Sequence, residues 1–414
     1  MDTKTLRCGL LGRKLGHSYS PAIHERLADY SYRLFEVEPE DLGAFLQEGA
    51  FDGLNVTIPY KKDVIPYCAE LSDTARAIGA VNTLVRRADG TLWGDNTDAY
   101  GFSMLVQSSG ADVAGKKALV FGSGGASATA QYVLRRLGAR EVVVISRHGE
   151  DNYENLDRHA DAQIAVNTTP VGMYPNTGVS PVDLHRLPRL EAALDVVYNP
   201  ARTEFLLQAE ARGLRRANGL LMLAAQAKKS CEDFTGEPVD DAKIFSITKA
   251  LEAQMHNVIL IGMPGSGKTT IGTLVAKRLG RTFVDADSAL EREAGMPIPE
   301  IFRREGEAGF RRRETAALAE LGRQSGLVLA TGGGSVTREE NYPLLHQNGE
   351  IFCLQRALER LPSAGRPVSQ ALGAQTIYAQ RKPLYARFAD AMIDNNGTPE
   401  AAAAQILEVL GCSC

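Results

Sequence analysis

The chain has 414 residues, of which 44% are hydrophobic and 23% charged, and its formal net charge at pH 7 is −4. This composition is typical of a globular protein and excludes an intrinsically disordered chain. The small negative charge gives no general attraction to nucleic acid, and no apolar stretch is long enough to span a bilayer. We therefore expect two or three domains, with neither a nucleic-acid partner nor a membrane segment.

The cysteines and the N-terminal segment bear on the compartment. The cysteines are far apart in the sequence and form no paired metal-binding motif: Cys8, Cys68, Cys231, Cys353, Cys412 and Cys414. Reduced thiols in a cytoplasmic protein are therefore expected. The first residues lack the apolar core and small-residue cleavage site of a secretory signal.

Short β-rich runs alternate with helical patterns, which predicts an α/β fold with mainly parallel sheets. In the first unit we expect strands at 6–12, 32–38 and 51–59, helices at 20–30 and 63–79, and a hairpin made of 82–87 and 91–96. In the second unit we expect strands at 116–122, 141–146, 163–169 and 194–199, followed by a helix at 220–234.

Polar residues gather in three segments of the first unit, HSYSP, NVTIPYK and the flanks of the hairpin. Helix capping accounts for Ser20, which precedes Pro21, but it accounts poorly for Ser18. Turn chemistry alone can explain any single Asn or Asp beside the hairpin. These local explanations remain open alternatives to a binding site.

The second unit carries a glycine-rich loop between a strand and a helix. It is a variant of G-x-G-x-x-G that runs from Gly122 to Ser127 and permits close approach to a pyrophosphate. The next strand ends in Ser146 and Arg147, and an arginine there suits the 2′-phosphate of NADP. The nearby acids Glu150 and Asp151 keep NAD as an alternative.

As a set, HSYSP, NVTIPYK, AVNTL, GDNTD, GSGGA, DVVYNP and NGLLMLAAQA resemble shikimate dehydrogenases across roughly 5–245. The resemblance implies that the ring acid is bound by Ser18, Ser20, Thr57, Asn82, Asp98, Tyr198 and Gln226. It implies that NADP(H) is bound by Gly122, Ser123, Gly124, Gly125, Ala126, Ser146, Arg147, Gly219 and Met222. It also makes Lys61 and Asp98 the catalytic pair.

The chemistry of a ketone reduction is consistent with that pair. The reaction needs a hydride on carbon and a proton on oxygen. The Lys61 ammonium can donate the proton while the Asp98 carboxylate holds the ammonium in place. The two groups would titrate together, so their acid and base roles are not divided further.

A run without Gly or Pro at 240–255 predicts a helical connector to a third unit. That unit opens with a strand and then GMPGSGKT, which fits the G-x-x-x-x-G-K-[ST] phosphate loop. Backbone N–H groups of such a loop bind phosphate oxygens, Lys268 supplies a positive charge, and Thr269 offers a hydroxyl to Mg²⁺. The residues expected to bind ATP are Gly265, Ser266, Gly267, Lys268, Thr269 and Thr270.

Two carboxylates follow the next strand, at the strand end where α/β sites lie. Either of Asp285 and Asp287 could hold the Mg²⁺ water shell while the other accepts a hydroxyl proton. Arg311, Arg381 and a turn of three glycines around Gly333 would suit a small hydroxylated carboxylate. A surface ion pair is the alternative for either arginine taken alone.

Together GMPGSGKTTIG, FVDAD, GEAGFR, LATGGGSV, GRP and RKPLY resemble shikimate kinases across 256–414. The resemblance implies a P-loop fold like that of nucleoside monophosphate kinases, with Asp287 and Lys268 catalytic and Asp285 bound to Mg²⁺ through water. It implies that shikimate is held by Asp287, Arg311, Gly333 and Arg381. It also places Arg366 on a short lid over ATP.

We therefore expect a bifunctional enzyme of aromatic amino-acid biosynthesis that uses NADP(H), ATP and Mg²⁺. Its first half would reduce 3-dehydroshikimate to shikimate, and its second half would phosphorylate shikimate. The expected domains are 1–102 with 220–250 for substrate, a Rossmann domain at 103–219 for NADP, and 256–414 for the kinase. The alternatives are a quinate/shikimate dehydrogenase, and a degenerate half that serves only for binding or regulation.

Overall fold

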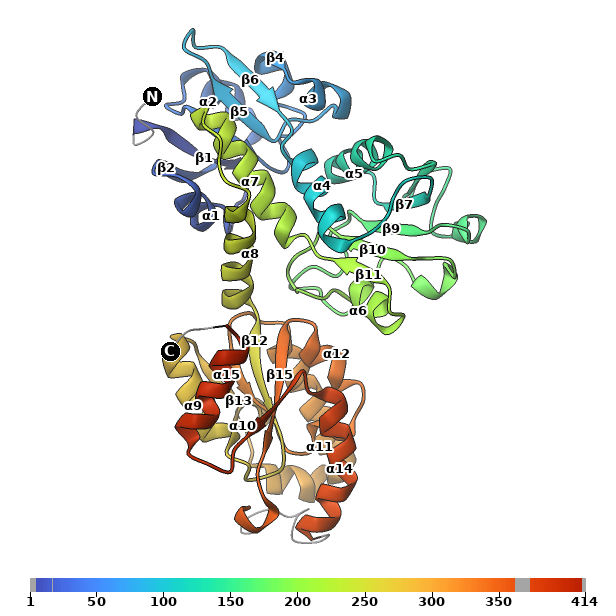
Figure 1. Ribbon diagram of the computed structural model, residues 1–414, viewed down its shortest axis with the longest axis vertical. Coiled ribbons are helices and arrows are strands. Elements are labelled where there is room, and N and C mark those ends of the chain that lie inside the picture. Colours follow the sequence, from blue (N-terminus) through green and yellow to red (C-terminus); the bar gives the residue numbers. More distant parts are fainter. Residues whose placement is uncertain (1–4, 17, 362–372, 412–414) are drawn as a thin grey trace. The chain divides into compact units, whose positions relative to one another are not determined.

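The computed structural model describes residues 5–16, 18–361 and 373–411, and the chain divides into two compact units. Unit 1 consists of Met1–Met173, Val179–Tyr198 and Phe205–Ala250, and unit 2 of Tyr174–Gly178, Asn199–Glu204 and Leu251–Cys414. Both units combine helices with largely parallel sheets, so the predicted α/β class is confirmed (Figure 1).

The first sheet of unit 1 has the strand order β2-β1-β3-β5-β6-β4. Its strands are β1 (Arg7–Gly12), β2 (Ser31–Glu36), β3 (Gly53–Val56), β4 (Cys68–Leu71), β5 (Thr83–Arg86) and β6 (Leu92–Asp95). β1 is parallel to β2 and β3, whereas β5 runs antiparallel to both β3 and β6. The predicted hairpin is therefore present. Leu11, Leu54 and Leu84 are fully buried in the core beneath this sheet.

This topology brings three chain segments to one edge of the sheet. Asn55 pairs with Thr83, and Thr83 pairs with Asp95. Three segments therefore lie side by side: the residues after β3, the residue before β5 and the residues after β6. Helix α4 (Asp98–Ser109) begins immediately after β6, which places Asp98 at the same edge.

The prediction of one helix over 63–79 is wrong. The segment forms a short 3₁₀ turn at Ile65–Tyr67, strand β4, and then helix α3 (Asp73–Ile78). Pro66 has no N–H to continue a helix, and the Ser72 Oγ accepts a hydrogen bond from the Ala75 N–H, so the helix begins only after Ser72. The remaining helices of this part are α1 (Ser20–Leu27) and α2 (Leu42–Glu48).

The second sheet of unit 1 is parallel, with the strand order β11-β10-β9-β7-β8. Its strands are β7 (Lys117–Phe121), β8 (Glu141–Ile145), β9 (Ile164–Asn167), β10 (Ala192–Asp195) and β11 (Arg215–Ala217). Helices α5 (Gly125–Arg136), α6 (Glu204–Ala211) and α7 (Leu220–Thr235) belong to this region of the chain. This is the predicted Rossmann-like sheet. α7 packs against both α1 and α4 (Figure 1).

Unit 2 contains a parallel five-stranded sheet of order β13-β14-β12-β15-β16. Its strands are β12 (Asn257–Ile261), β13 (Phe283–Asp285), β14 (Val328–Ala330), β15 (Gly349–Gln355) and β16 (Ala391–Asp394). Its helices are α9 (Lys268–Leu279), α10 (Ala286–Ala294), α11 (Ile298–Gly322), α12 (Asn341–His346), α14 (Ala374–Phe388) and α15 (Pro399–Val409). Buried Val258, Leu260 and Ile271 join the central strand to the helix behind the phosphate loop.

The segment predicted to be a helical connector forms helix α8 (Ala242–Met255). Among the described residues, no helix is both long enough and apolar enough to cross a bilayer.

Candidate functional site

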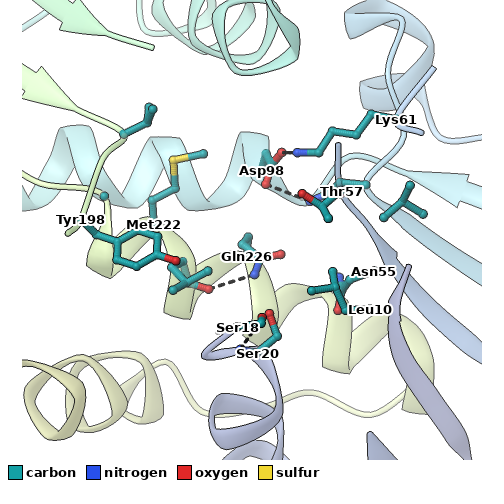
Figure 2. Close-up of a pocket in the computed structure, with 15 residues that line it drawn as sticks. Leu10, Ser18, Ser20, Asn55, Thr57, Lys61, Asp98, Tyr198, Met222 and Gln226 are labelled. Carbon is teal, nitrogen blue, oxygen red and sulfur yellow. Dashed lines mark hydrogen bonds and ion pairs between the residues drawn. The ribbon is translucent and has the colours of Figure 1, made fainter. Parts of the chain in front are cut away.

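A cavity of about 260 Å³ lies at the edge where β3, β5 and β6 meet α7 (Figure 2). Every residue of unit 1 that was predicted to hold the ring acid lines it, together with Lys61: Ser18, Ser20, Thr57, Asn82, Asp98, Tyr198 and Gln226. These residues come from widely separated parts of the sequence. The fold therefore gathers the polar motifs of the first unit around one space.

Lys61 and Asp98 form an ion pair at this cavity (Figure 2). The Lys61 Nζ lies 2.5 Å from the Asp98 Oδ2, and both side chains are largely buried. The other carboxylate oxygen of Asp98 accepts a hydrogen bond of 2.9 Å from the Asn82 Nδ2. The Asn82 Oδ1 in turn accepts from the Thr97 N–H at 2.7 Å, which fixes the start of α4. An ammonium is thus held at the cavity by a carboxylate that is itself held in place.

The serines at the start of α1 have roles that differ from the expected cap. Ser20 is the first residue of the helix and not its N-cap, which is Tyr19. The Ser18 Oγ accepts a hydrogen bond of 3.2 Å from the Ser20 N–H. The predicted capping role of Ser20 is therefore wrong, and both serines line the cavity.

A buried polar network beneath the cavity was not predicted as part of the site. The Asn55 Nδ2 donates to the Ser230 Oγ at 2.7 Å, and the Asn55 Oδ1 accepts from the Tyr32 hydroxyl at 2.8 Å. The Ser230 Oγ also lies 3.0 Å from the hydroxyl oxygens of Thr83 and Thr97. Asn55 lines the cavity and belongs to the NVTIPYK motif, so the sequence could have indicated it. Ser230 lies on α7 and joins the network only because that helix packs against the first sheet.

A second and larger cavity of about 1040 Å³ adjoins the glycine loop of the Rossmann-like sheet. Its lining includes Gly122, Ser123, Gly124, Gly125, Ala126, Ser146 and Arg147. Gly122 has a φ of 107°, which favours glycine, and Gly124 is the N-cap of α5. The helix N-terminus and the Arg147 guanidinium give the cavity a positive character that fits a phosphorylated dinucleotide.

Gly219 and Met222, which were predicted to bind NADP(H), line the smaller cavity and not the larger one. Gly219 passes so close to the Val196 backbone that a Cβ would collide with the Val196 carbonyl oxygen. Tyr198 lines the same wall, and burial raises the pKa of its hydroxyl. Thr57 and Lys61 line both cavities, so the Lys61 ammonium lies where the two spaces meet.

The phosphate loop of unit 2 joins β12 to α9. Its glycines Gly262, Gly265 and Gly267 all have positive φ angles, as the tight curl of such a loop requires. The Lys268 Nζ donates hydrogen bonds to the carbonyl oxygens of Gly262 at 2.9 Å and Met263 at 3.1 Å. The remaining predicted loop residues are Ser266, which is buried, and Thr269 and Thr270, which are exposed at the start of α9.

Thr269 and Asp285 are close enough to share a metal ion. The Thr269 Oγ1 donates to the Asp285 Oδ2 at 3.0 Å. The other carboxylate oxygen of Asp285 accepts from the Asp287 N–H at 3.1 Å and caps α10. A hydroxyl and a carboxylate beside a phosphate loop are the oxygen donors that Mg²⁺ prefers, so the residues fit that ion.

The turn Gly332–Gly334 gathers the residues predicted to hold shikimate. A Cβ on Gly332 would lie 2.9 Å from the Asp287 Oδ1, and a Cβ on Gly334 would collide with the Arg311 guanidinium. The Gly333 carbonyl oxygen accepts from the Arg381 Nη1 at 3.0 Å. A Cβ on Gly333 would lie 2.6 Å from Pro264 of the phosphate loop. The glycines therefore permit a close approach of two arginines, a carboxylate and the loop.

Glu314 is a member of this cluster that was not predicted. Its Oε2 lies 2.7 Å from the Arg311 Nη1, and the glutamate is almost fully buried. A Cβ on Gly332 would lie 2.6 Å from its Oε1, which makes no hydrogen bond within the described residues. The position of Glu314 one helical turn after Arg311 was the only sequence signal.

Burial and neighbouring charges raise the pKa of the Asp287 carboxyl. Its pKa is raised to about 6, first by burial and then by the negative charges of Glu314 and Asp285, against the opposing effect of Lys268 and Arg311. A carboxylate with such a pKa is suited to accept a proton from a hydroxyl. Arg366, predicted on the lid, lies outside the described residues.

Two family models match the chain, and they match different parts of it. Residues 10–84 match the shikimate dehydrogenase substrate binding domain, and residues 264–411 match shikimate kinase. The shikimate dehydrogenase (NADP(+)) of Clostridium perfringens strain SM101 is 36% identical over 267 residues, which cover 59% of this chain and 98% of the relative.

Solved structures give the same result for the first part. The chorismate mutase/shikimate 5-dehydrogenase fusion protein of Clostridium acetobutylicum is 35% identical, with a TM-score of 0.57 over 60% of this chain and 97% of that one. The shikimate 5-dehydrogenase of Thermus thermophilus, solved with NADP(H) and shikimate, is 33% identical, with a TM-score of 0.55 over 59% and 99%. The chain therefore belongs to the shikimate dehydrogenase family and joins that enzyme to a C-terminal shikimate kinase domain.

Proposed function

We propose that unit 1 reduces 3-dehydroshikimate to shikimate with NADPH. The observation that carries this proposal is the position of Lys61, which lines both the small polar cavity and the larger cavity beside the glycine loop. A ketone in the first cavity and a nicotinamide reaching it from the second would meet at this residue. Bound NADPH would supply the hydride.

The residues of the chain would handle the proton and orient the ring. The Lys61 ammonium would donate a proton to the developing alkoxide, and Asp98 would hold that ammonium at 2.5 Å. Ser18, Ser20 and Thr57 would accept or donate hydrogen bonds to the carboxylate and hydroxyls of the ring acid. Arg147 would bind the 2′-phosphate that distinguishes NADP from NAD.

For unit 2 we propose transfer of the γ-phosphate of ATP to shikimate, which gives shikimate 3-phosphate. Asp287 would accept the hydroxyl proton, while Arg311 and Arg381 would hold the substrate carboxylate. The contact of Gly333 with Pro264 supports this proposal, because it puts the substrate cluster beside the phosphate loop. Thr269 and, through water, Asp285 would hold Mg²⁺.

Assays of the purified full chain with each substrate separate this proposal from its alternatives. We expect NADPH oxidation with 3-dehydroshikimate, and ADP formation with ATP, Mg²⁺ and shikimate. Turnover of quinate with NAD at a rate above that of shikimate with NADP would instead indicate a quinate/shikimate dehydrogenase. Absence of ADP formation while unit 2 is folded would indicate a binding or regulatory module. The cytoplasmic location and the three domain boundaries stay predictions.

A further inference from the structure

A third cavity, of about 260 Å³, lies in unit 2 beside the phosphate loop and is distinct from the turn that gathers Asp287, Arg311 and Arg381. It is lined by Met263 of the loop, the end of β15 and one side of α14. Two contacts with backbone carbonyl oxygens tie it to the loop. The Asn395 side chain, next to the lining residue Asn396, donates to the Ser266 carbonyl oxygen, and a Cβ on Gly262 would lie 2.8 Å from the Leu354 carbonyl oxygen. The cavity therefore lies beside the phosphate loop, to which the ends of β15 and β16 are packed.

Arg356 brings a guanidinium to this cavity from the residue after β15. Its Nη1 lies 3.9 Å from the point where a Cβ of Gly267 would stand. Its Nε is buried and has no hydrogen-bond partner in the described part of the chain. A buried guanidinium donor without an acceptor is costly unless a ligand supplies one. The fork of Nε and Nη is the group that binds phosphate oxygens in pairs.

Lys382 lines the same cavity from α14, with its Nζ 5.9 Å from the centre of the Tyr378 ring. It directly follows Arg381, whose Nη1 bonds to Gly333 in the substrate cluster. Successive residues of a helix point to different sides of it. The helix α14 therefore presents one cation to the substrate cluster and the next to this cavity.

The charges of the cavity favour an anion. Two of its described lining residues are cationic, none is acidic, and the amides of Gln355 and Asn396 add neutral hydrogen-bonding groups. Burial raises the pKa of the lining residue Cys353 to about 11, against the opposing effect of the Lys268 charge. That effect places Lys268 close to the cavity. A polyphosphate lying on the loop would bring negative charge toward these cations.

We propose that Arg356 and Lys382 bind the polyphosphate chain of ATP from the β15 side, in addition to the backbone groups of the phosphate loop and Lys268. This inference rests on the proposed kinase function and adds two nucleotide-binding residues to it. Arg356 contacts phosphate oxygens through Nε and one Nη, and Lys382 acts as a second point charge. Neither side chain contacts shikimate.

The test is calorimetric binding of Mg·ADP to the full-length protein and to Arg356→Gln, Arg356→Lys and Lys382→Gln. The matched control is Arg387→Gln. Arg387 is an exposed arginine on α14, the helix that carries Lys382, and it pairs with Glu339. Competition by inorganic tripolyphosphate shows whether the lost contact is to phosphate. NADPH oxidation and the KM for shikimate report on folding and on the other sites.

We expect Arg356→Gln to weaken Mg·ADP and tripolyphosphate binding by about tenfold or more, as loss of a charge-assisted contact does. Arg356→Lys should recover part of this loss, and Lys382→Gln should show a smaller one. Arg387→Gln should bind like the wild type.

Unchanged ADP binding in Arg356→Gln overturns the inference and leaves the kinase function standing. Weaker ADP with unchanged tripolyphosphate overturns the phosphate assignment, because the contact would then be to base or ribose. A wild-type protein that binds no Mg·ADP overturns both the inference and the kinase function.

Discussion

The Lys61 Nζ lies 2.5 Å from the Asp98 Oδ2, across 37 residues of sequence. Lys61 follows strand β3, and Asp98 begins helix α4. The partner strands β5 and β6 bring these two positions to one edge of the sheet. Asn82 completes the arrangement, because it donates to Asp98 and accepts from the Thr97 N–H. The orientation of the ammonium thus depends on a buried amide that does not touch it.

Asn82→Ala tests that dependence. Asp98 would lose the donor to its Oδ1, and the buried Thr97 N–H would lose its acceptor. We expect the free energy of unfolding to fall by about 1–3 kcal/mol, and the kcat of NADPH oxidation to fall with it. Urea denaturation and steady-state kinetics measure the two effects. Gln107→Ala, at an exposed position of the same helix, should change neither quantity. A variant with wild-type kcat would show that Asn82 does not position Asp98.

The raised pKa of Asp287 predicts an acid limit for the kinase reaction. Only the deprotonated carboxyl can accept the hydroxyl proton, and burial with two neighbouring carboxylates raises its pKa to about 6. The kcat/KM for shikimate should therefore be constant above this pH and fall about tenfold for each pH unit below it. A pH profile of ADP formation measures this acid limb, the decrease of kcat/KM at low pH. A profile that stays flat well below pH 6 would contradict the assignment of Asp287 as the base.

Glu314→Gln should move that acid limb to lower pH. The Glu314 charge is the second cause of the raised Asp287 pKa, and its removal leaves the opposing Arg311 charge less compensated. The KM for shikimate should rise, because Arg311 loses its nearest anchor at 2.7 Å. Glu307→Gln is the matched control, since Glu307 is exposed and lies 3.4 Å from the same guanidinium. A limb that moves to higher pH, or moves equally in both variants, would refute this explanation.

His24 predicts an acid sensitivity of unit 1. The ring is fully buried, its Nδ1 lies 2.6 Å from the Tyr30 hydroxyl, and burial lowers its pKa from 6.5 to about 3. Between these two pKa values the unfolded chain binds a proton that the folded chain does not. The His24 contribution to the free energy of unfolding should therefore be constant above pH 6.5 and decrease as the pH falls toward 3, by at most about 1.4 kcal/mol per pH unit.

The single tryptophan, Trp93 in β6, reports on the unfolding of this unit by its fluorescence. His24→Gln should be less stable at neutral pH and should lose part of the slope between pH 6.5 and 3. His185→Gln, at an exposed position, should retain the wild-type slope. If the slope in His24→Gln equals that of the wild type, another group carries the acid sensitivity.

The sequence sufficed where a motif is local. The phosphate loop around Lys268 and the glycine loop around Gly124 combine a strand, a turn and a helix within a few residues, so their geometry follows from the order of residues. The substrate residues could be named because their motifs resemble known families. Their convergence around Lys61 depends on strand order, which the sequence does not contain.

The elements and site residues that the sequence did not predict depend on contacts between distant parts of the chain. Strand β4 has only four residues, none of them fully buried, and pairs with β6 across the sequence, so its local pattern looked like part of a helix. β11 is short and largely exposed, which leaves no alternation to detect. Ser230 and Glu314 belong to the sites only because α7 returns to the first sheet and α11 passes beside the Gly332 turn. Contacts of this kind require the tertiary structure.

We propose that the chain carries two independent catalytic sites, which act on consecutive forms of the same ring acid. The measurement that separates the two sites supplies purified Lys61→Ala and Lys268→Ala with 3-dehydroshikimate, NADPH and ATP with Mg²⁺, and follows NADPH oxidation and shikimate phosphorylation separately. We predict that Lys61→Ala loses NADPH oxidation but phosphorylates added shikimate. Lys268→Ala should do the reverse and accumulate shikimate. The proposal would be wrong if either folded variant lost both activities, or if both variants kept both activities.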